Sequence, residues 1–295
     1  MSRHWTCRDR RLDWENRTLL MGILNVTPDS FSDAGQYFDP VSAIRHADRL
    51  FEAGADLVDV GGESSRPGAE TVPVEEELRR VLPVVREVAG KGGRLLSIDT
   101  VKYEVAARAL EAGAAVINDI SGLQNDVRLA SLAASAQAGL VIMHRRGNPK
   151  TMQSFIEYED LISDLRRFFR RQVDRAKESG VRDSQIALDP GIGFSKTAEQ
   201  NLTLIHRLRE IRLENYPILL GVSRKAFIGK VTGAEVENRL FGTAGAMAAG
   251  ILSGANIVRV HDVREMREVA AVVDAIRRES VSERQEEVSS SFPSV

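Results

Sequence analysis

AGADLVDV, from Ala53 to Val60, returns twice in altered form, as AGAAVIND from Ala112 to Asp119 and as SGANIVRV from Ser253 to Val260. Each copy has a glycine of the kind that ends a helix, followed by an apolar run typical of a buried strand. The repeat predicts that helix, tight turn and strand form a unit used several times along the chain.

Eight apolar runs of this kind occur, rich in Val, Ile and Leu and nearly continuous, as parallel strands covered on both faces are. They lie at 19–26, 55–62, 94–100, 114–121, 139–145, 185–191, 217–224 and 255–262. Helical patterns between them include 41–54, 74–90, 102–113 and 199–213, and Gly139 is expected to end a helix as Gly54, Gly113 and Gly254 do. Eight such units predict an α/β fold, the (β/α)8 TIM barrel.

An open doubly wound sheet is the alternative, but no G-x-G-x-x-G follows a strand, and eight units is the number that closes a barrel. One barrel accommodates 295 residues. We expect residues 1–18 to cap the bottom of the barrel, residues 19–277 to form it, and the Ser/Glu-rich residues 278–295 to be a disordered tail.

Composition excludes several classes of protein. With 28% charged residues, a net charge of -2 and 5% aromatic residues, the chain resembles no nucleic-acid binder. No apolar stretch is long enough to span a membrane. The single cysteine, Cys7, permits no disulfide within one chain and is expected in a loose N-terminus, which fits a cytoplasmic protein.

Polar side chains end almost every predicted strand. They are Asn25, Asp59, Asp99, Asn118, His144, Asp189, Ser223 to Lys225, Arg259 and His261. Because the carboxyl ends of barrel strands gather at one face, these groups should meet there. One alone would suggest a helix cap or, for His144, a core histidine, but the ring as a whole indicates a functional site.

The chemistry of this ring suggests a ligand with two unlike ends. Asp99, Asn118 and Asp189 suit a flat heterocycle with N–H donors, whereas Arg259 and His261 suit phosphate oxygens, with Lys225 as a further cation. A heterocycle carrying a phosphate or pyrophosphate fits both. The loop NVTPDSFSDAG, residues 25–35, is longer than a simple connection needs, which suggests that it has a functional role.

At these residues the sequence resembles the dihydropteroate synthases, the folate-pathway transferases that sulfonamides target. The matching segments, in the family's order, are MGILNVTPDSFSD, DVGGESSRPGAE, SIDT, INDISG, MHRRGNPKTMQ, LDPGIGF, GVSRKAFIG and RVHDV. The resemblance implies a cytoplasmic homodimeric barrel enzyme. It would use Mg²⁺ to condense 6-hydroxymethyl-7,8-dihydropterin pyrophosphate with 4-aminobenzoate.

The resemblance also implies residue roles. The pterin would be bound by Asp99, Asn118, Met143, Asp189, Phe194 and Lys225. The pyrophosphate would be bound by Asn25, Ser65, Arg259 and His261, with Asn25 also a ligand of Mg²⁺. The aminobenzoate would be framed by Phe31, Ser65, Arg66, Pro67, Phe194 and Ser223. The catalytic residues implied are Asp33, Arg66, Asp99 and Lys225.

Three positions depart from the family pattern: Ala34, Ser65 and Arg145. Ser65 keeps a hydroxyl. Arg145 adds a cation, and the sequence alone does not decide whether this cation lies at the pterin rim or in solvent. Two alternatives remain. A pterin-dependent methyltransferase would not need RPGA or SRK, and a non-catalytic pterin-binding paralogue would be expected to have lost ligands.

Overall fold

The computed structural model of the chain describes residues 3–27, 39–213 and 216–280. In this part of the chain eight strands form one parallel sheet, in the order β8-β7-β6-β5-β4-β3-β10-β9. Their bounds are β3 (Leu19–Asn25), β4 (Leu57–Gly61), β5 (Leu96–Asp99), β6 (Val116–Asp119), β7 (Gly139–Met143), β8 (Ile186–Asp189), β9 (Leu219–Leu220) and β10 (Ile257–Val260). A parallel bridge from Leu188 to Ile218 joins the two ends of the sheet, so the predicted TIM barrel is confirmed.

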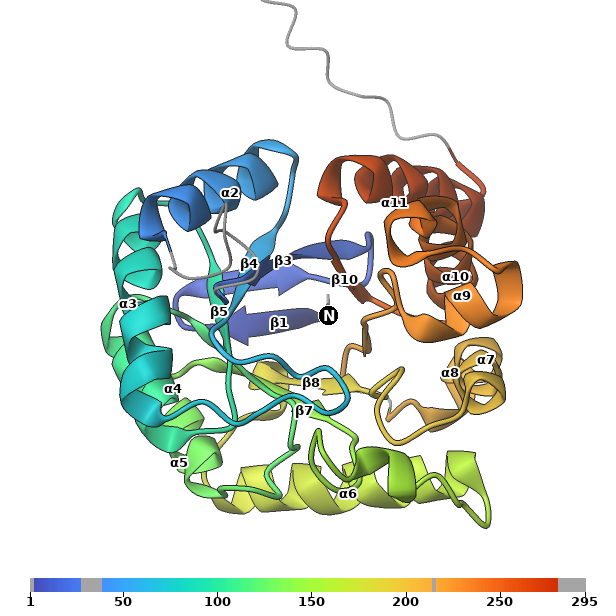
Figure 1. Ribbon diagram of the computed structural model, residues 1–295, viewed down its shortest axis with the longest axis horizontal. Coiled ribbons are helices and arrows are strands. Elements are labelled where there is room, and N and C mark those ends of the chain that lie inside the picture. Colours follow the sequence, from blue (N-terminus) through green and yellow to red (C-terminus); the bar gives the residue numbers. More distant parts are fainter. Residues whose placement is uncertain (1–2, 28–38, 214–215, 281–295) are drawn as a thin grey trace, which may run out of the picture.

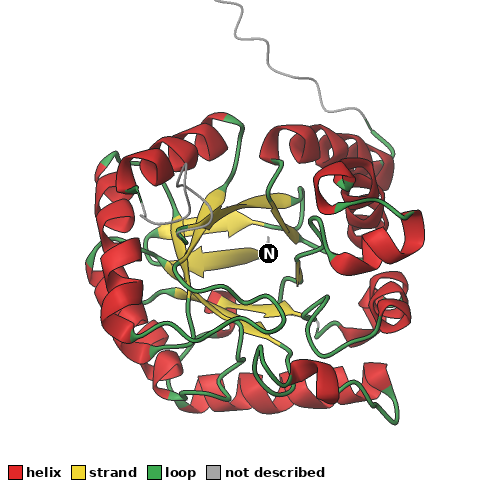
Figure 2. Cartoon of the chain, viewed as in Figure 1, coloured by secondary structure: helices red, strands yellow, loops and turns green. Residues whose placement is uncertain are grey.

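Helices surround the barrel (Figure 1, Figure 2). They are α2 (Pro40–Glu52), α3 (Val74–Gly90), α4 (Tyr103–Glu111), α5 (Arg128–Ser135), α6 (Leu161–Glu178), α7 (Ala198–His206), α8 (Leu208–Ile211), α9 (Ala226–Thr232), α10 (Leu240–Leu252) and α11 (Val263–Arg278). The strands are nearly all buried, with helices packed on their outer face. This explains why their sequences are continuously apolar rather than alternating.

Two local predictions were wrong. Gly139 does not end a helix: Gln137 takes the left-handed conformation there (φ 53°), and Gly139 is the first residue of β7. A Cβ at Gly139 would lie 2.7 Å from Cys7 Sγ, so a close approach explains this glycine. The helix expected over 199–213 is broken at Arg207 (φ -101°, ψ 23°), and the shorter α8 then buries Leu208 and Ile211.

The N-terminal residues pack against the amino ends of the barrel strands. β1 (His4–Cys7) pairs antiparallel with β2 (Arg10–Asp13), and Trp5 donates from Nε1 to Gln185 O at 2.7 Å. Trp5, Cys7 and Trp14 are buried in one apolar cluster with Leu19 of β3. Cys7 was therefore wrongly expected in a loose segment, and burial raises the pKa of its thiol.

Helix α10 holds the small residues of TAGAMAAGILSG close to the barrel. A Cβ at Gly250 would lie 2.2 Å from Leu220 of β9, and one at Gly242 would lie 2.3 Å from Ile228 of α9. Gly242 and Gly250 therefore allow close helix packing within this chain, whereas a Cβ at Gly245 would meet nothing within 4 Å. Among the described residues, no helix is both long and apolar enough to cross a membrane.

Candidate active site

Acidic, amide and guanidinium groups from four strands meet at the carboxyl end of the barrel. Arg259 of β10 donates from Nε to Asp59 Oδ2 at 2.7 Å and from Nη2 to Asp99 Oδ2 at 2.9 Å. Asn118 of β6 donates from Nδ2 to Asp59 Oδ2 at 2.8 Å. Asp59 is fully buried, so it holds Arg259 and Asn118 in place from beneath.

A second group of predicted residues follows β8 and β9. Asp189 accepts from the Gly191 N–H at 2.7 Å, which fixes its carboxylate against the turn that carries Phe194. Lys225 Nζ lies 4.3 Å from the centroid of the Phe194 ring, within the range of a cation–π contact. Phe194 also packs with Met143, so this wall of the site is apolar.

His261 and Ser223 are joined at the ends of β10 and β9. Ser223 Oγ accepts from the backbone N–H of His261 at 3.2 Å and lies 2.9 Å from the ring atom His261 Nδ1. Burial, with the charges of Arg259 and Arg224, lowers the pKa of His261 to about 4. The imidazole is therefore neutral at pH 7 and is available as a hydrogen-bonding group rather than a cation.

The acids and bases of the site have displaced titrations. Burial raises the pKa of Asp99 to about 7, although Arg259 opposes this. Burial raises the pKa of Asp189 to about 6, against the hydrogen bond from Gly191. Burial and the charge of Arg259 lower the pKa of Lys225 to about 8. Such shifts among clustered groups are typical of active sites.

A cavity of about 220 Å³ opens beside this cluster. The loop over residues 62–73, which crosses the interior of the ring in Figure 1, contributes Glu63, Ser64, Ser65, Ala69 and Thr71 to the lining of this cavity. The loop is tied to the segment after β7, because Gly68 N donates to Pro149 O at 3.0 Å and Lys150 pairs with Glu70 at 2.6 Å. Asp99, Ser65 and Arg145 all line the cavity, so the loop brings Ser65 over the barrel end.

Comparison with known proteins shows the family of this chain. Residues 21–261 match the family described as pterin binding enzyme. The chain belongs to the pterin binding enzyme family. It is 48% identical over 267 residues to the dihydropteroate synthase of Synechocystis sp., covering 90% of this chain and 92% of that protein.

Solved structures resemble this pterin binding enzyme over nearly its whole length. The Xanthomonas albilineans dihydropteroate synthase with 4-aminobenzoic acid has a TM-score of 0.87 and 38% identity, covering 94% of this chain and 99% of its own. The Yersinia pestis dihydropteroate synthase in a sulfonamide drug complex has a TM-score of 0.87 and 41% identity, covering 93% and 99%.

Not every predicted residue of this pterin binding enzyme joins the cluster. Arg66 and Pro67 are exposed on the loop over residues 62–73, and neither lines the cavity. Asn25, half-buried, ends β3 opposite Gly61 of β4. Phe31 and Asp33 lie outside the described residues, as does Ala34. Arg259 was expected to bind phosphate oxygens, but Asp59 and Asp99 already engage two of its three nitrogens.

Sequence reasoning missed several groups that support the site. Lys102 Nζ bonds Glu63 and the Val72 carbonyl, at 2.6 and 2.7 Å, and also bonds Glu77. It thereby pins both ends of the loop that carries Ser65. Arg145 is only 2% exposed, which settles that its side chain is not in solvent. Lys102 and Lys196 follow no strand directly, so the strand-end signal passed over them.

This protein alone would offer few ligands to a magnesium ion. Among the described residues, no three His, Cys, Asp or Glu side chains form a metal-binding group. Asp59 and Asp99 already pair with Arg259, which leaves the Asn25 amide as the ligand that the sequence predicts. That set fits an ion such as Mg²⁺ that keeps waters and takes phosphate oxygens from a substrate.

Proposed function

We propose that this chain is a dihydropteroate synthase. It would join 6-hydroxymethyl-7,8-dihydropterin pyrophosphate to 4-aminobenzoate, giving 7,8-dihydropteroate and pyrophosphate for folate biosynthesis. The observation that supports this most strongly is the meeting of Asp99, Asp189, Lys225 and Arg259 at one end of the barrel. They combine acceptors for a heterocycle with cations for its phosphate.

The pterin is assigned to the deeper part of the site. Asp189 and Asn118 offer oxygens to its N–H groups, and Asn118 Oδ1 is a buried acceptor with no hydrogen-bond partner among the described residues. Lys225 would donate to the pterin's own acceptors, while Met143 and Phe194 pack against the ring. A buried amide oxygen without a partner costs about 1–3 kcal/mol, which a bound N–H donor would recover.

The pyrophosphate is assigned to Asn25, Ser65, Arg259 and His261. The Ser223 hydroxyl accepts from the backbone N–H of His261, so it can donate its own proton to His261 Nδ1. The imidazole then carries its proton on Nε2, which can donate to an anion. Mg²⁺ bound with the pyrophosphate through Asn25 would neutralise charge on the leaving group. Arg259 Nη1 supplies a further donor, because Nε and Nη2 are already engaged.

We infer a dissociative reaction, in which the carbon–oxygen bond breaks before the new carbon–nitrogen bond is complete. The electron-rich dihydropterin delocalises positive charge from its CH₂ group, and the ionised carboxylates of Asp99 and Asp33 stabilise that charge. The amine of aminobenzoate is a weak base, so it needs positioning more than deprotonation. Ser65, Arg66, Pro67, Phe31, Phe194 and Ser223 would provide it, with up to about 7–11 kcal/mol available from ideal placement.

Homodimer formation and a cytoplasmic location belong to the same proposal, with no nucleic acid or membrane as partner. Phe241 of α10 is 87% exposed, and Leu252 is exposed on the same helix. An exposed apolar helix face of this kind suits a second copy of the chain. Sulfonamide binding is proposed because the related Yersinia pestis enzyme was solved with such a drug.

The deciding experiment is Mg²⁺-dependent condensation of the two substrates by pure protein, followed as pyrophosphate release. Release that requires aminobenzoate supports the synthase. Pterin binding with no turnover would instead favour the non-catalytic paralogue, and pyrophosphate release that does not depend on aminobenzoate would contradict the synthase. Methyl transfer with a corrinoid partner would favour the methyltransferase. Removing Mg²⁺ with a chelator should abolish release, and adding Mg²⁺ back should restore it.

A further inference from the structure

Lys196 is a buried lysine that the proposed chemistry does not use. Its ammonium lies 3.0 Å from His144 Nδ1 and donates to Gly191 O at 3.1 Å and to Phe194 O at 2.9 Å. An ammonium has three N–H donors, and these three nearest acceptors match them, with His144 O more distant at 3.5 Å. Lys196 is 4% exposed, and no carboxylate of the described residues pairs with it within 4.0 Å.

Burying a cation without a carboxylate is costly, so its placement needs an explanation. Lys196 follows a turn of unusual backbone conformation, in which Gly191, Gly193 and Ser195 have φ values of 67°, 82° and 47°. This conformation turns the carbonyls of Gly191 and Phe194 toward one point, where they need a donor. Gly191 O also accepts from the Phe194 N–H at 3.1 Å, so an apolar side chain at position 196 would remove one of its two donors and the Lys196 donor of Phe194 O.

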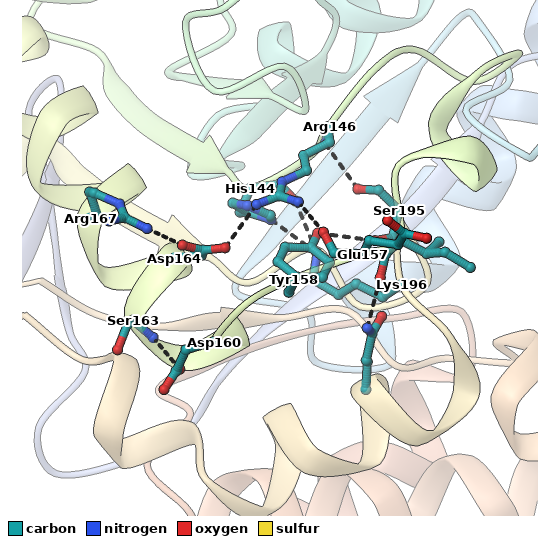
Figure 3. Close-up of polar contacts among 12 residues, drawn as sticks. His144, Arg146, Glu157, Tyr158, Asp160, Ser163, Asp164, Arg167, Ser195 and Lys196 are labelled. Carbon is teal, nitrogen blue, oxygen red and sulfur yellow. Dashed lines mark hydrogen bonds and ion pairs between the residues drawn. The ribbon is translucent and has the colours of Figure 1, made fainter.

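The same turn is tied to the segment after β7, as Figure 3 shows. Ser195 Oγ accepts from the Arg146 N–H at 2.9 Å, and Ser195 O accepts from the Tyr158 hydroxyl at 3.0 Å. The Arg146 guanidinium stacks 3.9 Å from the Tyr158 ring centroid and pairs with Asp164 of α6 at 2.9 Å. The turn is therefore held from behind by the neighbouring barrel unit, which runs from β7 to α6.

The front of the turn forms the pterin wall described above. Gly191 donates to Asp189, and Phe194 lies against Lys225. We propose that Lys196 is a positioning residue, whose ammonium fixes the turn over residues 191–195 so that Asp189 and Phe194 are in place for the pterin. The role in pterin binding rests on the proposed function, but the role in fixing the turn does not.

Burial and the nearby charges shift the titration of both Lys196 and His144. Burial lowers the pKa of Lys196 to about 7, with Asp189 opposing and Arg146 and Lys225 adding to the shift. Burial and the charge of Lys196 keep the pKa of His144 well below its usual value, so the ring is neutral and Nδ1 is able to accept. His144 then carries its proton on Nε2 and packs edge-on to Phe168, at 4.8 Å between ring centroids.

The test compares Lys196→Met with Gln185→Met in the full chain. Gln185 is buried too and donates to the carbonyls of Ala133 and Ala138, but it lies at the amino end of β8, away from the site. Binding of 6-hydroxymethylpterin is measured by calorimetry, and stability by urea. We expect Lys196→Met to weaken binding more than ten-fold, and Gln185→Met to leave it within two-fold at a similar loss of stability.

Hydrogen exchange provides a second measurement, independent of the ligand. In Lys196→Met, amides over residues 189–197 should exchange more than ten-fold faster, while those of β3 to β6 stay protected. If Lys196→Met does not fold, Tyr158→Phe, which removes one bond to Ser195 O, should give the same local pattern at two- to five-fold. Unchanged exchange in the turn, or equal weakening by Gln185→Met, would overturn the proposal.

The two proposals fail differently. Wild-type protein that binds no pterin would contradict the proposed function, while faster exchange confined to the turn would still support the role of Lys196 in fixing it. If Lys196→Met binds pterin as tightly as the wild type does, only the positioning role is contradicted.

Discussion

Arg259 donates from Nη2 to Asp99 Oδ2 at 2.9 Å, although 160 positions separate the two residues. The same guanidinium bonds Asp59 from Nε, so one cation holds two carboxylates of neighbouring strands. Its side chain is 19% exposed, and that of Asp59 is fully buried. The end of the barrel is therefore organised around a buried charge network before any ligand arrives.

Arg259→Met should destabilise the fold strongly. Removing one partner of a buried pair leaves uncompensated charge and typically costs about 3–5 kcal/mol. Urea unfolding at pH 8 measures this, and the loss should shrink at pH 5, where Asp99 is able to take up a proton. Arg207→Met, which removes an ion pair with Glu210 between two side chains 44% and 50% exposed, should cost less than about 1 kcal/mol. Equal losses for the two variants would contradict the network.

The pH dependence of kcat/KM should be bell-shaped. Burial raises the pKa of Asp99 to about 7, and the proposed reaction needs its carboxylate, so activity should rise with pH through that value. Burial lowers the pKa of Lys225 to about 8, and the pterin needs its ammonium, so activity should fall above that value. If kcat/KM does not change between pH 5 and pH 9, the protonation states of Asp99 and Lys225 do not control the rate.

Asp189→Asn should stabilise the protein at neutral pH while weakening pterin binding. Burial raises the pKa of Asp189 to about 6, against 3.8 unfolded. Between those values the folded state keeps a proton that the unfolded state has lost, so stability falls as pH rises through this window. Asparagine removes that loss, which amounts to at most about 3 kcal/mol, and still accepts from Gly191.

The difference between Asp189→Asn and wild type should therefore be largest near pH 8 and vanish below about pH 4. Urea unfolding at several pH values measures it. Asp126→Asn provides a control of opposite sign, because the hydrogen bond from Arg128 lowers the pKa of Asp126. Its effect should be destabilising near neutral pH. A variant at position 189 that is less stable than wild type at pH 8 would contradict the argument.

Gly191→Ala should be poorly tolerated. A Cβ there would lie 2.1 Å from His144 O, in addition to the strain of φ 67°. Gly233→Ala is the matched control, since φ is 74° and a Cβ would meet nothing within 4 Å. The control should lose about 1–2 kcal/mol, the cost of a left-handed conformation, and Gly191→Ala clearly more. Similar urea midpoints for the two variants would show that the turn adjusts to a Cβ at position 191 at little cost, which would contradict the prediction.

Lys225→Ala should weaken both substrates. The ammonium faces Phe194, which is assigned to both the pterin and the aminobenzoate, and it interacts with Asp189 and Asp99. Kd values for 6-hydroxymethylpterin and KM values for aminobenzoate should each rise about ten-fold or more, the loss expected for a charged hydrogen bond. An effect on neither would move the SRK segment to a structural role.

Much of this fold and of the set of candidate site residues was predictable because it depends on residues that are close together in the chain. Continuous apolar runs identified all eight strands. Polar residues at the strand ends gave the candidates Asp99, Asn118, Asp189 and Lys225, which the structure brings to one end of the barrel. The glycine at 139 was misread because its reason, contact with Cys7, lies 132 positions away in the chain. Lys196 gave no local signal either, since its three acceptors come together only when two neighbouring units of the barrel pack.

The sequence by itself determined the number of strand–helix units and the set of polar groups at the strand ends, because apolar periodicity and strand-end positions depend on neighbouring residues. Tertiary structure alone decided which of these groups pair. Closure of the barrel brings Asp59, Asp99 and Arg259 within hydrogen-bonding distance and removes water from them. In that dry interior an unpaired charge is costly, so the pairing and the shifted titrations follow from the closed barrel.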